Sequence, residues 1–338
     1  MKTDELEKNL KEGKLESIYL LYGEETYLLE SAVKKIKNLF GEKVAGINYI
    51  TIDETNLPEL INNLDMPAFG FEKKLIVVKN SDLFKKEAKK KTAKAQSEAQ
   101  KIAEYLINNQ EEVKQANVLV FITEEAEKND LYQAIEKTGI ICNFEKLKAQ
   151  ELVKRLKGIC ALYKVKTDEA TLSYLIQNCG TGMQELIGEI RKLIEYAGEG
   201  GSFGKEEVDL LCIKQVEAVI FDVTDYLGSK NTKAAIDTLH ELIANKEPLQ
   251  RLLVLIYNHF KKLYFTKLAL QSGKNLAESL GLKPNQLFLT TKYKKQASYF
   301  EQATLRNILR ELADLDANYK LGLIDLQVGL ESILCNYC

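Results

Sequence analysis

At 338 residues the chain exceeds one typical domain, so two or three domains are expected. Its net charge of −2 excludes attraction of the whole molecule to nucleic acid or to an anionic membrane, but it leaves room for local basic patches. No stretch approaches the roughly 20 consecutive apolar residues of a membrane span. The charged start, MKTDELEKNLKEGK, is not a secretory signal, and we therefore expect a cytoplasmic protein.

The first part of the chain alternates strand-like and helix-like runs. Several strand candidates are continuous apolar runs rich in β-branched residues, which is typical of strands covered on both faces. Between them lie helical patterns of apolar residues. Alternation of this kind predicts an α/β domain over 1–146, with a parallel sheet and flanking helices. The strand candidates are 17–22, 46–53, 74–80, 118–123 and 140–146.

From Gln150 onward the strand signals stop. Helical patterns predict a small helical domain over 147–213 and a larger all-helical domain over 214–338. His240 and His259, the only histidines, lie on or beside apolar stripes of the larger domain. A histidine in such a stripe is more often a packed core residue than a catalytic one, and we expect both to be packed.

A short turn joins the first strand to a helix, which is the layout of a phosphate-binding loop. That turn consists of Gly23, Glu24 and Glu25, and it lacks the lysine of the G-x-x-x-x-G-K-[ST] motif. Negative side chains at a helix N-terminus would repel a triphosphate. The third strand ends at Lys79 and Asn80, where acidic residues that hold Mg²⁺ are usual. We therefore expect that the chain neither binds nor hydrolyses ATP. The turn is either a degenerate phosphate-binding loop or part of another α/β fold that never bound nucleotide.

A crowded apolar segment, NLDMPAFGFEKKL (63–75), precedes the third strand. Its proline and glycine indicate a helix end or turn, which tends to lie at the surface. One interpretation is a helix end that faces the core; the other is an exposed wedge that docks into a pocket of another protein. The residues of this candidate wedge are Leu64, Met66, Ala68, Phe69 and Phe71.

Two basic segments are candidates for nucleic-acid contact. The stretch 85–101 holds seven lysines without arginine or aromatic residues, and a solvated loop or helix face is the default interpretation. The segment KYKKQASYF (292–300) mixes lysine with aromatic residues and is the better candidate. Its candidate DNA contacts are Lys292, Tyr293, Lys294 and Lys295.

The six cysteines give no sign of a metal site in the sequence. Scattered cysteines of a reducing compartment are mostly small buried apolar residues. Cys335 and Cys338 have the CxxC spacing, but no second pair completes a zinc site. We expect no metal, no cofactor and no catalytic residue.

Five motifs in this order resemble the delta subunit family of the bacterial DNA polymerase III clamp loader, from about residue 15 to the C-terminus. They are IYLLYGEETYLLESAVKKI, DMPAFGFEKKLIVVKN, GTGMQELIGEIRKL, VIFDVTDYL and LADLDANYKLG. The resemblance implies an AAA+-like fold that has lost nucleotide binding (1–146), a helical lid (147–213) and a helical collar through which five subunits form a ring (214–338).

The resemblance also implies a function. A member of this family binds and opens the sliding clamp (the beta subunit) through an apolar wedge, so that the clamp is loaded onto primed DNA. Met66 and Phe69 fit the wedge, while Ala68 stands where a larger apolar residue is common, and Phe71 is the candidate to compensate. Other implied partners are the remaining clamp-loader subunits, through the collar, and primer-template DNA in the assembled complex. The chain would be a non-catalytic subunit of a DNA-directed DNA polymerase, a nucleotidyltransferase.

Three other interpretations compete with this one. A delta-prime-like subunit would carry a four-cysteine zinc module, which the spacing of the cysteines does not fit. An active AAA+ ATPase would need the missing lysine and acids, and a nucleotide titration would reveal it. A DNA-binding regulator that uses the helical C-terminal half would bind DNA with steep salt dependence.

Overall fold

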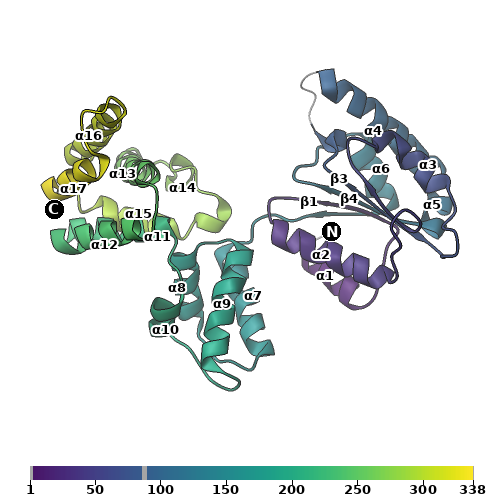
Figure 1. Cartoon of the computed structure of the whole chain (residues 1–338), viewed down its shortest axis with the longest axis horizontal. Coiled ribbons are helices and arrows are strands. Elements are labelled where there is room, and N and C mark those ends of the chain that lie inside the picture. Colours follow the sequence, from purple (N-terminus) through teal and green to yellow (C-terminus); the bar gives the residue numbers. More distant parts are fainter. Residues whose placement is uncertain (1–2, 86–89, 338) are drawn as a thin grey trace. The chain divides into compact units, whose positions relative to one another are not determined.

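The computed structural model describes residues 3–85 and 90–337. The chain divides into two compact units, Met1–Lys146 and Leu147–Cys338 (Figure 1). The finer division of the helical part at 213/214 stays a prediction. In the described ranges, no helix is both long and apolar enough to cross a membrane.

Five parallel strands form the sheet of the first unit, in the order β2-β3-β4-β1-β5. Each predicted strand is present, so the predicted parallel α/β class is confirmed. Because β1 lies inside the sheet between β4 and β5, and both neighbours are distant from it in sequence, the turn after β1 lies where ligands bind in open α/β sheets. The strands are β1 (Ile18–Tyr22), β2 (Tyr49–Ile52), β3 (Lys74–Lys79), β4 (Asn117–Thr123) and β5 (Ile140–Asn143).

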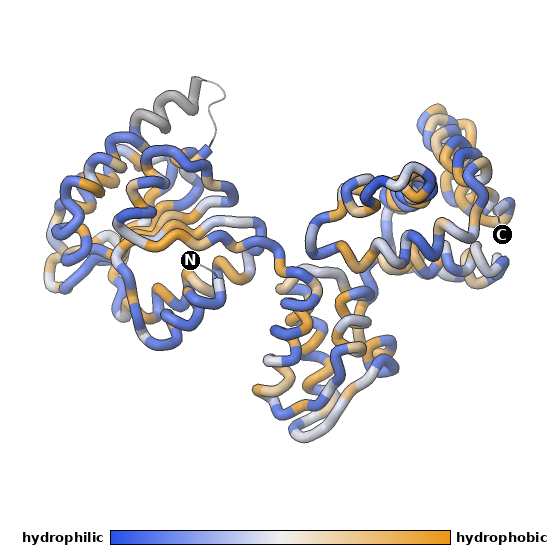
Figure 2. The backbone as a smooth tube through the Cα atoms, turned by 180° about the vertical axis from the view of Figure 1, so that it is seen from behind, coloured by the Kyte–Doolittle hydropathy of each residue, from blue (hydrophilic) through white to orange (hydrophobic). Residues whose placement is uncertain are grey.

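Helices cover both faces of this sheet (Figure 1). Ile18 and Leu20 of β1 belong to the core that the helices of one face build, whereas Tyr19 and Leu21 point to the other face and are equally buried. Figure 2 shows the strands as almost continuous apolar segments, as burial on both faces requires. One face carries α1 (Thr3–Lys11) and α2 (Thr26–Phe40); the other carries α3 (Leu60–Asp65), α4 (Lys90–Asn108), α5 (Gln110–Ala116) and α6 (Asp130–Thr138).

The second unit is helical in its described residues. Its first four helices pack on one another, and the predicted absence of a further sheet is confirmed for this part of the chain. Seven more helices follow, and the longest, α13, packs against α15 and α16. The first set is α7 (Ala149–Leu162), α8 (Glu169–Cys179), α9 (Met183–Ala197) and α10 (Lys205–Leu211). The second is α11 (Val216–Gly228), α12 (Thr232–Ala244), α13 (Leu249–Ser272), α14 (Leu276–Ser279), α15 (Leu289–Ala297), α16 (Gln302–Lys320) and α17 (Leu326–Asn336).

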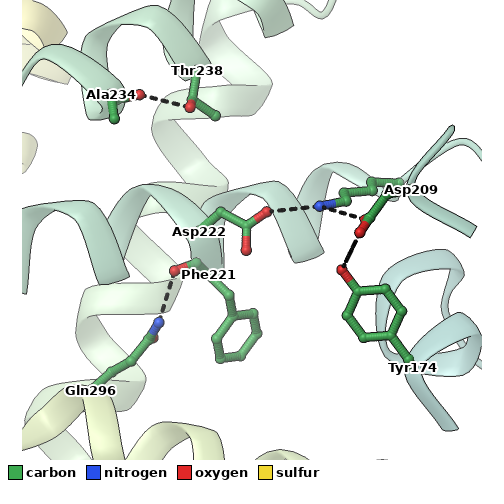
Figure 3. Close-up of polar contacts among 8 residues, drawn as sticks. Tyr174, Asp209, Phe221, Asp222, Ala234, Thr238 and Gln296 are labelled. Carbon is green, nitrogen blue, oxygen red and sulfur yellow. Dashed lines mark hydrogen bonds and ion pairs between the residues drawn. The ribbon is translucent and has the colours of Figure 1, made fainter. Parts of the chain in front are cut away.

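Lys214 joins the two sets of helices through polar contacts with Asp209 and Asp222, both of which are labelled in Figure 3. Its Nζ lies 3.5 Å from a carboxylate oxygen of Asp209 in α10 and 3.5 Å from one of Asp222 in α11. Asp209 in turn accepts a hydrogen bond from the Tyr174 hydroxyl of α8 at 2.8 Å. The connection from α10 to α11 is therefore held by charge as well as by apolar packing.

His259 is packed in the core of the second unit, as predicted. Its Nε2 donates to Gln296 Oε1 at 2.9 Å. Figure 3 shows the next contact, in which Gln296 Nε2 donates to the Phe221 carbonyl at 2.8 Å. The imidazole ring also packs edge-on against Phe221. The prediction for His240 was wrong: this residue lies at the surface, 2.8 Å from Glu331, because its helix turns that position away from the apolar stripe.

Burial of His259 makes the stability of the chain depend on pH. Burial lowers the pKa of His259 from 6.5 to about 4, so between these values the unfolded chain binds a proton that the folded chain resists. The contribution of neutral His259 to the free energy of unfolding is therefore complete above pH 6.5. It is lost as the pH falls towards 4. We expect urea denaturation to show a loss of about 2 kcal/mol from this residue between pH 7.5 and pH 5.

NMR titration of the imidazole measures this pKa directly. Because the chain has only two histidines, His240→Gln assigns the His259 resonance by elimination. A His259 resonance that titrates near 6.5 in the folded protein would contradict the expectation.

Candidate functional site

The candidate wedge lies between α3 and β3, in a segment that turns sharply. Met66 ends α3 in an extended conformation, and Pro67 follows it. Phe71 N–H then donates to the Ala68 carbonyl at 2.6 Å, with Gly70 at φ +83°. A type II turn requires a positive φ at its third position, where glycine is preferred. The turn places Phe69 at its corner.

Exposure separates the five predicted wedge residues. Met66 is 55% exposed and Phe69 is 73% exposed, although both side chains are large and apolar. Leu64 and Ala68 are buried, at 3% and 9% exposure, so including their side chains in an exposed wedge was wrong. Leu64, in the last turn of α3, packs into the apolar core between the sheet and the helices α3–α6. Phe71 is half-buried, and the exposed apolar surface is formed mainly by Met66 and Phe69.

Polar side chains from the sheet hold the end of α3 in place. The last carbonyls of a helix lack intrahelical partners. Here Lys74 Nζ donates to the Asn63 carbonyl, and Asn117 Nδ2 donates to the Leu64 carbonyl at 3.2 Å. Lys74 is only 1% exposed, and burial lowers its pKa. Sequence reasoning missed Lys74 and Asn117 because a single lysine or asparagine in a strand gives no local sign of burial.

The turn after β1 is closed by the chain itself. Phe144, just after β5, donates its N–H to the Tyr22 carbonyl at 2.6 Å, and its own carbonyl accepts from Glu25 N–H at 2.9 Å. Gly23 has φ +133°, and a Cβ there would lie 2.3 Å from the Phe144 carbonyl oxygen. A backbone donor at the start of α2, which a phosphate would need, is thus already used by the protein.

The two glutamates of this turn differ in their surroundings. Glu25 is buried, at 5% exposure, whereas Glu24 is exposed and lies 3.9 Å from Lys146 Nζ. At the end of β3, Lys79 is exposed and Asn80 adopts φ +51°. The first acid that follows, Asp82, pairs with Lys85 at 2.9 Å. After β1, Glu24 and Glu25 occupy the turn where a phosphate-binding loop would hold its phosphates. At the end of β3, Lys79 occupies the position where such a protein would have a metal-binding acid.

The basic segment at α15 is only partly exposed. Lys294 and Lys295 are exposed, and Lys295 lies 3.7 Å from Asp225. Lys292 lies over the Phe221 ring, and burial lowers its pKa. Tyr293 is 3% exposed, so its prediction as a DNA contact was wrong: the ring fills the core beside Phe221.

The other basic segment and the terminal cysteines are described only in part. In the stretch 85–101, residues 86–89 lie outside the described residues, and α4 begins at Lys90. Cys335 is exposed, while Cys338 also lies outside the described residues.

Two family models match the chain, one in each unit. A model described as DNA polymerase III, delta subunit, matches residues 19–145. A second, described as DNA polymerase III delta subunit, C-terminal domain, matches residues 217–337. The chain belongs to the DNA polymerase III delta subunit family. The resemblance of its five motifs is thereby confirmed, and the chain is a clamp-loader subunit with a part in DNA replication.

Similar proteins extend the delta match over the whole chain. The DNA polymerase III subunit delta of Bacillus subtilis (strain 168) is 24% identical over 339 residues, which cover 97% of this chain and 94% of that protein. The probable DNA polymerase III subunit delta of Aquifex aeolicus (strain VF5) is 29% identical over 318 residues, covering 90% and 87%. The solved structure of the Bacillus subtilis DNA clamp loader delta protein (YqeN) shares the fold, with a TM-score of 0.70, 23% identity and 99% coverage of both chains.

Proposed function

We propose that this delta-family chain binds and opens the sliding clamp by inserting Met66 and Phe69 into an apolar pocket of the clamp. The observation that carries the proposal is their exposure, 55% and 73%, at a turn braced by buried polar contacts. Large apolar side chains side by side at a surface indicate a site of protein interaction. Phe71, half-buried beside them, would add apolar area in place of the small Ala68.

Opening requires a difference in affinity between two states of the clamp. A wedge shifts the clamp towards the open form only if it binds that form more tightly than the closed one. In the proposed mechanism the ATP-binding subunits change conformation and free the wedge for the clamp. The delta-family chain acts mechanically, and none of its side chains performs covalent chemistry.

We also propose that the chain neither binds nor hydrolyses ATP. The Phe144 carbonyl accepts the Glu25 N–H and lies against Gly23, so the space and the donor that a phosphate would use are occupied. Glu24 and Glu25 add negative charge at the same turn, which a triphosphate would have to approach. Lys79 and Asn80 stand where an acid would hold Mg²⁺.

Contacts with the rest of the clamp loader are assigned to the helices α11–α17. The turn between α16 and α17, together with the first turn of α17, exposes a group of apolar side chains that would pack against neighbouring subunits in a collar. Lys294 and Lys295 remain candidate contacts with primer-template DNA in the assembled complex. The exposed apolar residues are Leu321, Leu323, Ile324 and Val328.

Binding of the purified full chain to an immobilised sliding clamp, without nucleotide, tests the proposal. Surface plasmon resonance should show a saturable complex, and an ATP titration of the chain alone should show no binding at millimolar nucleotide. A folded chain that does not bind the clamp would refute the wedge assignment. Micromolar affinity for ATP would refute the second proposal independently.

Lys74→Met should weaken clamp binding about tenfold, mainly through faster dissociation. Methionine keeps the length of the side chain but removes the donor to the Asn63 carbonyl, so the end of α3 loses one of its anchors. Lys73→Met is the matched control, because Lys73 Nζ donates elsewhere, to the Lys114 carbonyl at 2.8 Å. Equal effects of the two substitutions on the dissociation rate would contradict a specific role of Lys74.

A further inference from the structure

Two cysteines and a glutamate from three helices meet at one point of the second unit. Cys179 is the last residue of α8, Glu189 lies in α9, and Cys212 directly follows α10. One ligand atom of each residue lies within 4.8 Å of those of the other two. Cys179 is 2% exposed, Cys212 is half-buried, and the Glu189 side chain is 15% exposed. The cluster lies far from the candidate wedge in sequence and plays no part in the proposed function.

The donor set matches the preferences of zinc. Zn²⁺ binds thiolates at about 2.3 Å and carboxylate oxygens at about 2.0–2.2 Å in tetrahedral geometry. Ligand atoms placed within 4.8 Å of one another reach such a geometry through small side-chain adjustments. Three protein ligands leave a fourth position for water.

The surrounding charges favour a divalent cation. Lys192 Nζ lies 2.6 Å from Glu189 Oε2, so once both thiols are deprotonated the group of two thiolates, one carboxylate and one ammonium carries a net charge of −2. A divalent cation would neutralise the group, which matters for a partly buried site. The Ile213 N–H also donates to Glu189 Oε2 at 3.0 Å, and Lys192 Nζ donates to the Leu211 carbonyl at 3.1 Å. These contacts fix the carboxylate beside the sulfur atoms, as partners of metal ligands usually do.

The two thiols already lie close together. Their sulfur atoms lie within 4.8 Å of each other. Binding of Zn²⁺ would form two Zn–S bonds and release the thiol protons to solvent, without oxidation or reduction.

We propose that Cys179, Glu189 and Cys212 form a binding site for Zn²⁺ that ties the ends of α8 and α10 to α9. The three ligands come from three different helices or helix ends, so a bound ion would cross-link these helices and stabilise their packing. This inference revises the expectation of no metal, which considered the cysteines only by their spacing. Cys179 and Cys212 are more than thirty residues apart, so no short metal-binding spacing in the sequence indicates that they meet.

Zinc titration of the full chain tests the proposal. The purified protein is stripped with a chelator, reduced with a phosphine and titrated with Zn²⁺ alone, and bound metal is measured by mass spectrometry. We expect one Zn²⁺ per chain and a melting temperature that rises with zinc concentration. Cys179→Ser and Cys212→Ser should each weaken the affinity more than a hundredfold, and Glu189→Gln more than tenfold. Cys160→Ser, at a buried cysteine outside the cluster, is the matched control and should bind zinc normally.

The spectrum of Co²⁺ in the same site provides a readout that does not depend on stability. Sulfur-to-cobalt charge-transfer bands should appear in the wild type and in Cys160→Ser and should be lost in Cys212→Ser, whose half-buried position tolerates serine. Absence of zinc uptake by the folded, reduced chain would overturn the proposal. Undiminished uptake by Cys212→Ser and Glu189→Gln would overturn it too, as would a thiol pair that only forms a disulfide under mild oxidants.

Discussion

Replacing Met66 and Phe69 together with alanine should weaken binding to the sliding clamp at least a hundredfold. Burial of each side chain in a pocket of the clamp is worth about 1.5–3 kcal/mol, and each 1.4 kcal/mol changes the affinity tenfold. Both side chains are mainly exposed, so the free chain loses little packing when they are shortened. Surface plasmon resonance should show the loss, while circular dichroism and thermal denaturation should remain as in the wild type.

A double variant elsewhere on the surface controls for the general loss of apolar area. Leu162→Ala with Leu270→Ala removes two side chains that are 83% and 53% exposed in the second unit. This control should bind the clamp with wild-type affinity. Unchanged affinity of the Met66 and Phe69 double variant, in a folded sample, would refute the wedge. In that case the exposed pair would have to serve another partner.

Gly23→Ala should lower the free energy of unfolding by about 3 kcal/mol. Alanine at φ +133° is strained, and its Cβ would lie 2.3 Å from the Phe144 carbonyl oxygen, a backbone atom that cannot turn away. Relief of this clash would also disturb the hydrogen bond from Glu25 N–H to the same carbonyl. Urea denaturation followed by circular dichroism measures the effect.

Gly41→Ala separates the steric part of this cost from the backbone part. Gly41 also has a positive φ, of +90°, but a Cβ there would meet no atom within 4 Å. Its substitution should cost only about 1 kcal/mol. Equal losses in the two variants would mean that Phe144 moves aside easily, and the turn after β1 would then be less closed than its hydrogen bonds indicate.

The order of strands and helices could be predicted because its causes are local. Runs such as 75–78 and 118–123 are apolar and rich in β-branched residues, a pattern that is typical of strands covered on both faces. The long stripe of α13 repeats every three to four residues, which is the period of a helix with one buried face. The same local patterns, in order, also sufficed to indicate the family.

Individual side chains were predicted less well. Leu64 and Met66 are two residues apart and both apolar, yet one is in the core and the other at the surface. Tyr293 belongs to a lysine-rich segment that suggests a surface, but its ring fills the core, whereas His240 was expected to be packed and lies outside. Composition does not decide these cases, because the direction of a side chain depends on where its helix or turn sits against the rest of the unit.

The sequence by itself determined the fold class, the family and the absence of a phosphate-binding lysine, because each depends on residue type and periodicity along the chain. Only the tertiary structure decided that Lys74 and Asn117 brace α3, that Phe144 closes the turn at Gly23, and that Cys179 meets Cys212. These contacts join residues that are distant along the chain. The packing that brings them together is a property of the whole unit, since no local preference of the chain encodes which distant surfaces will meet.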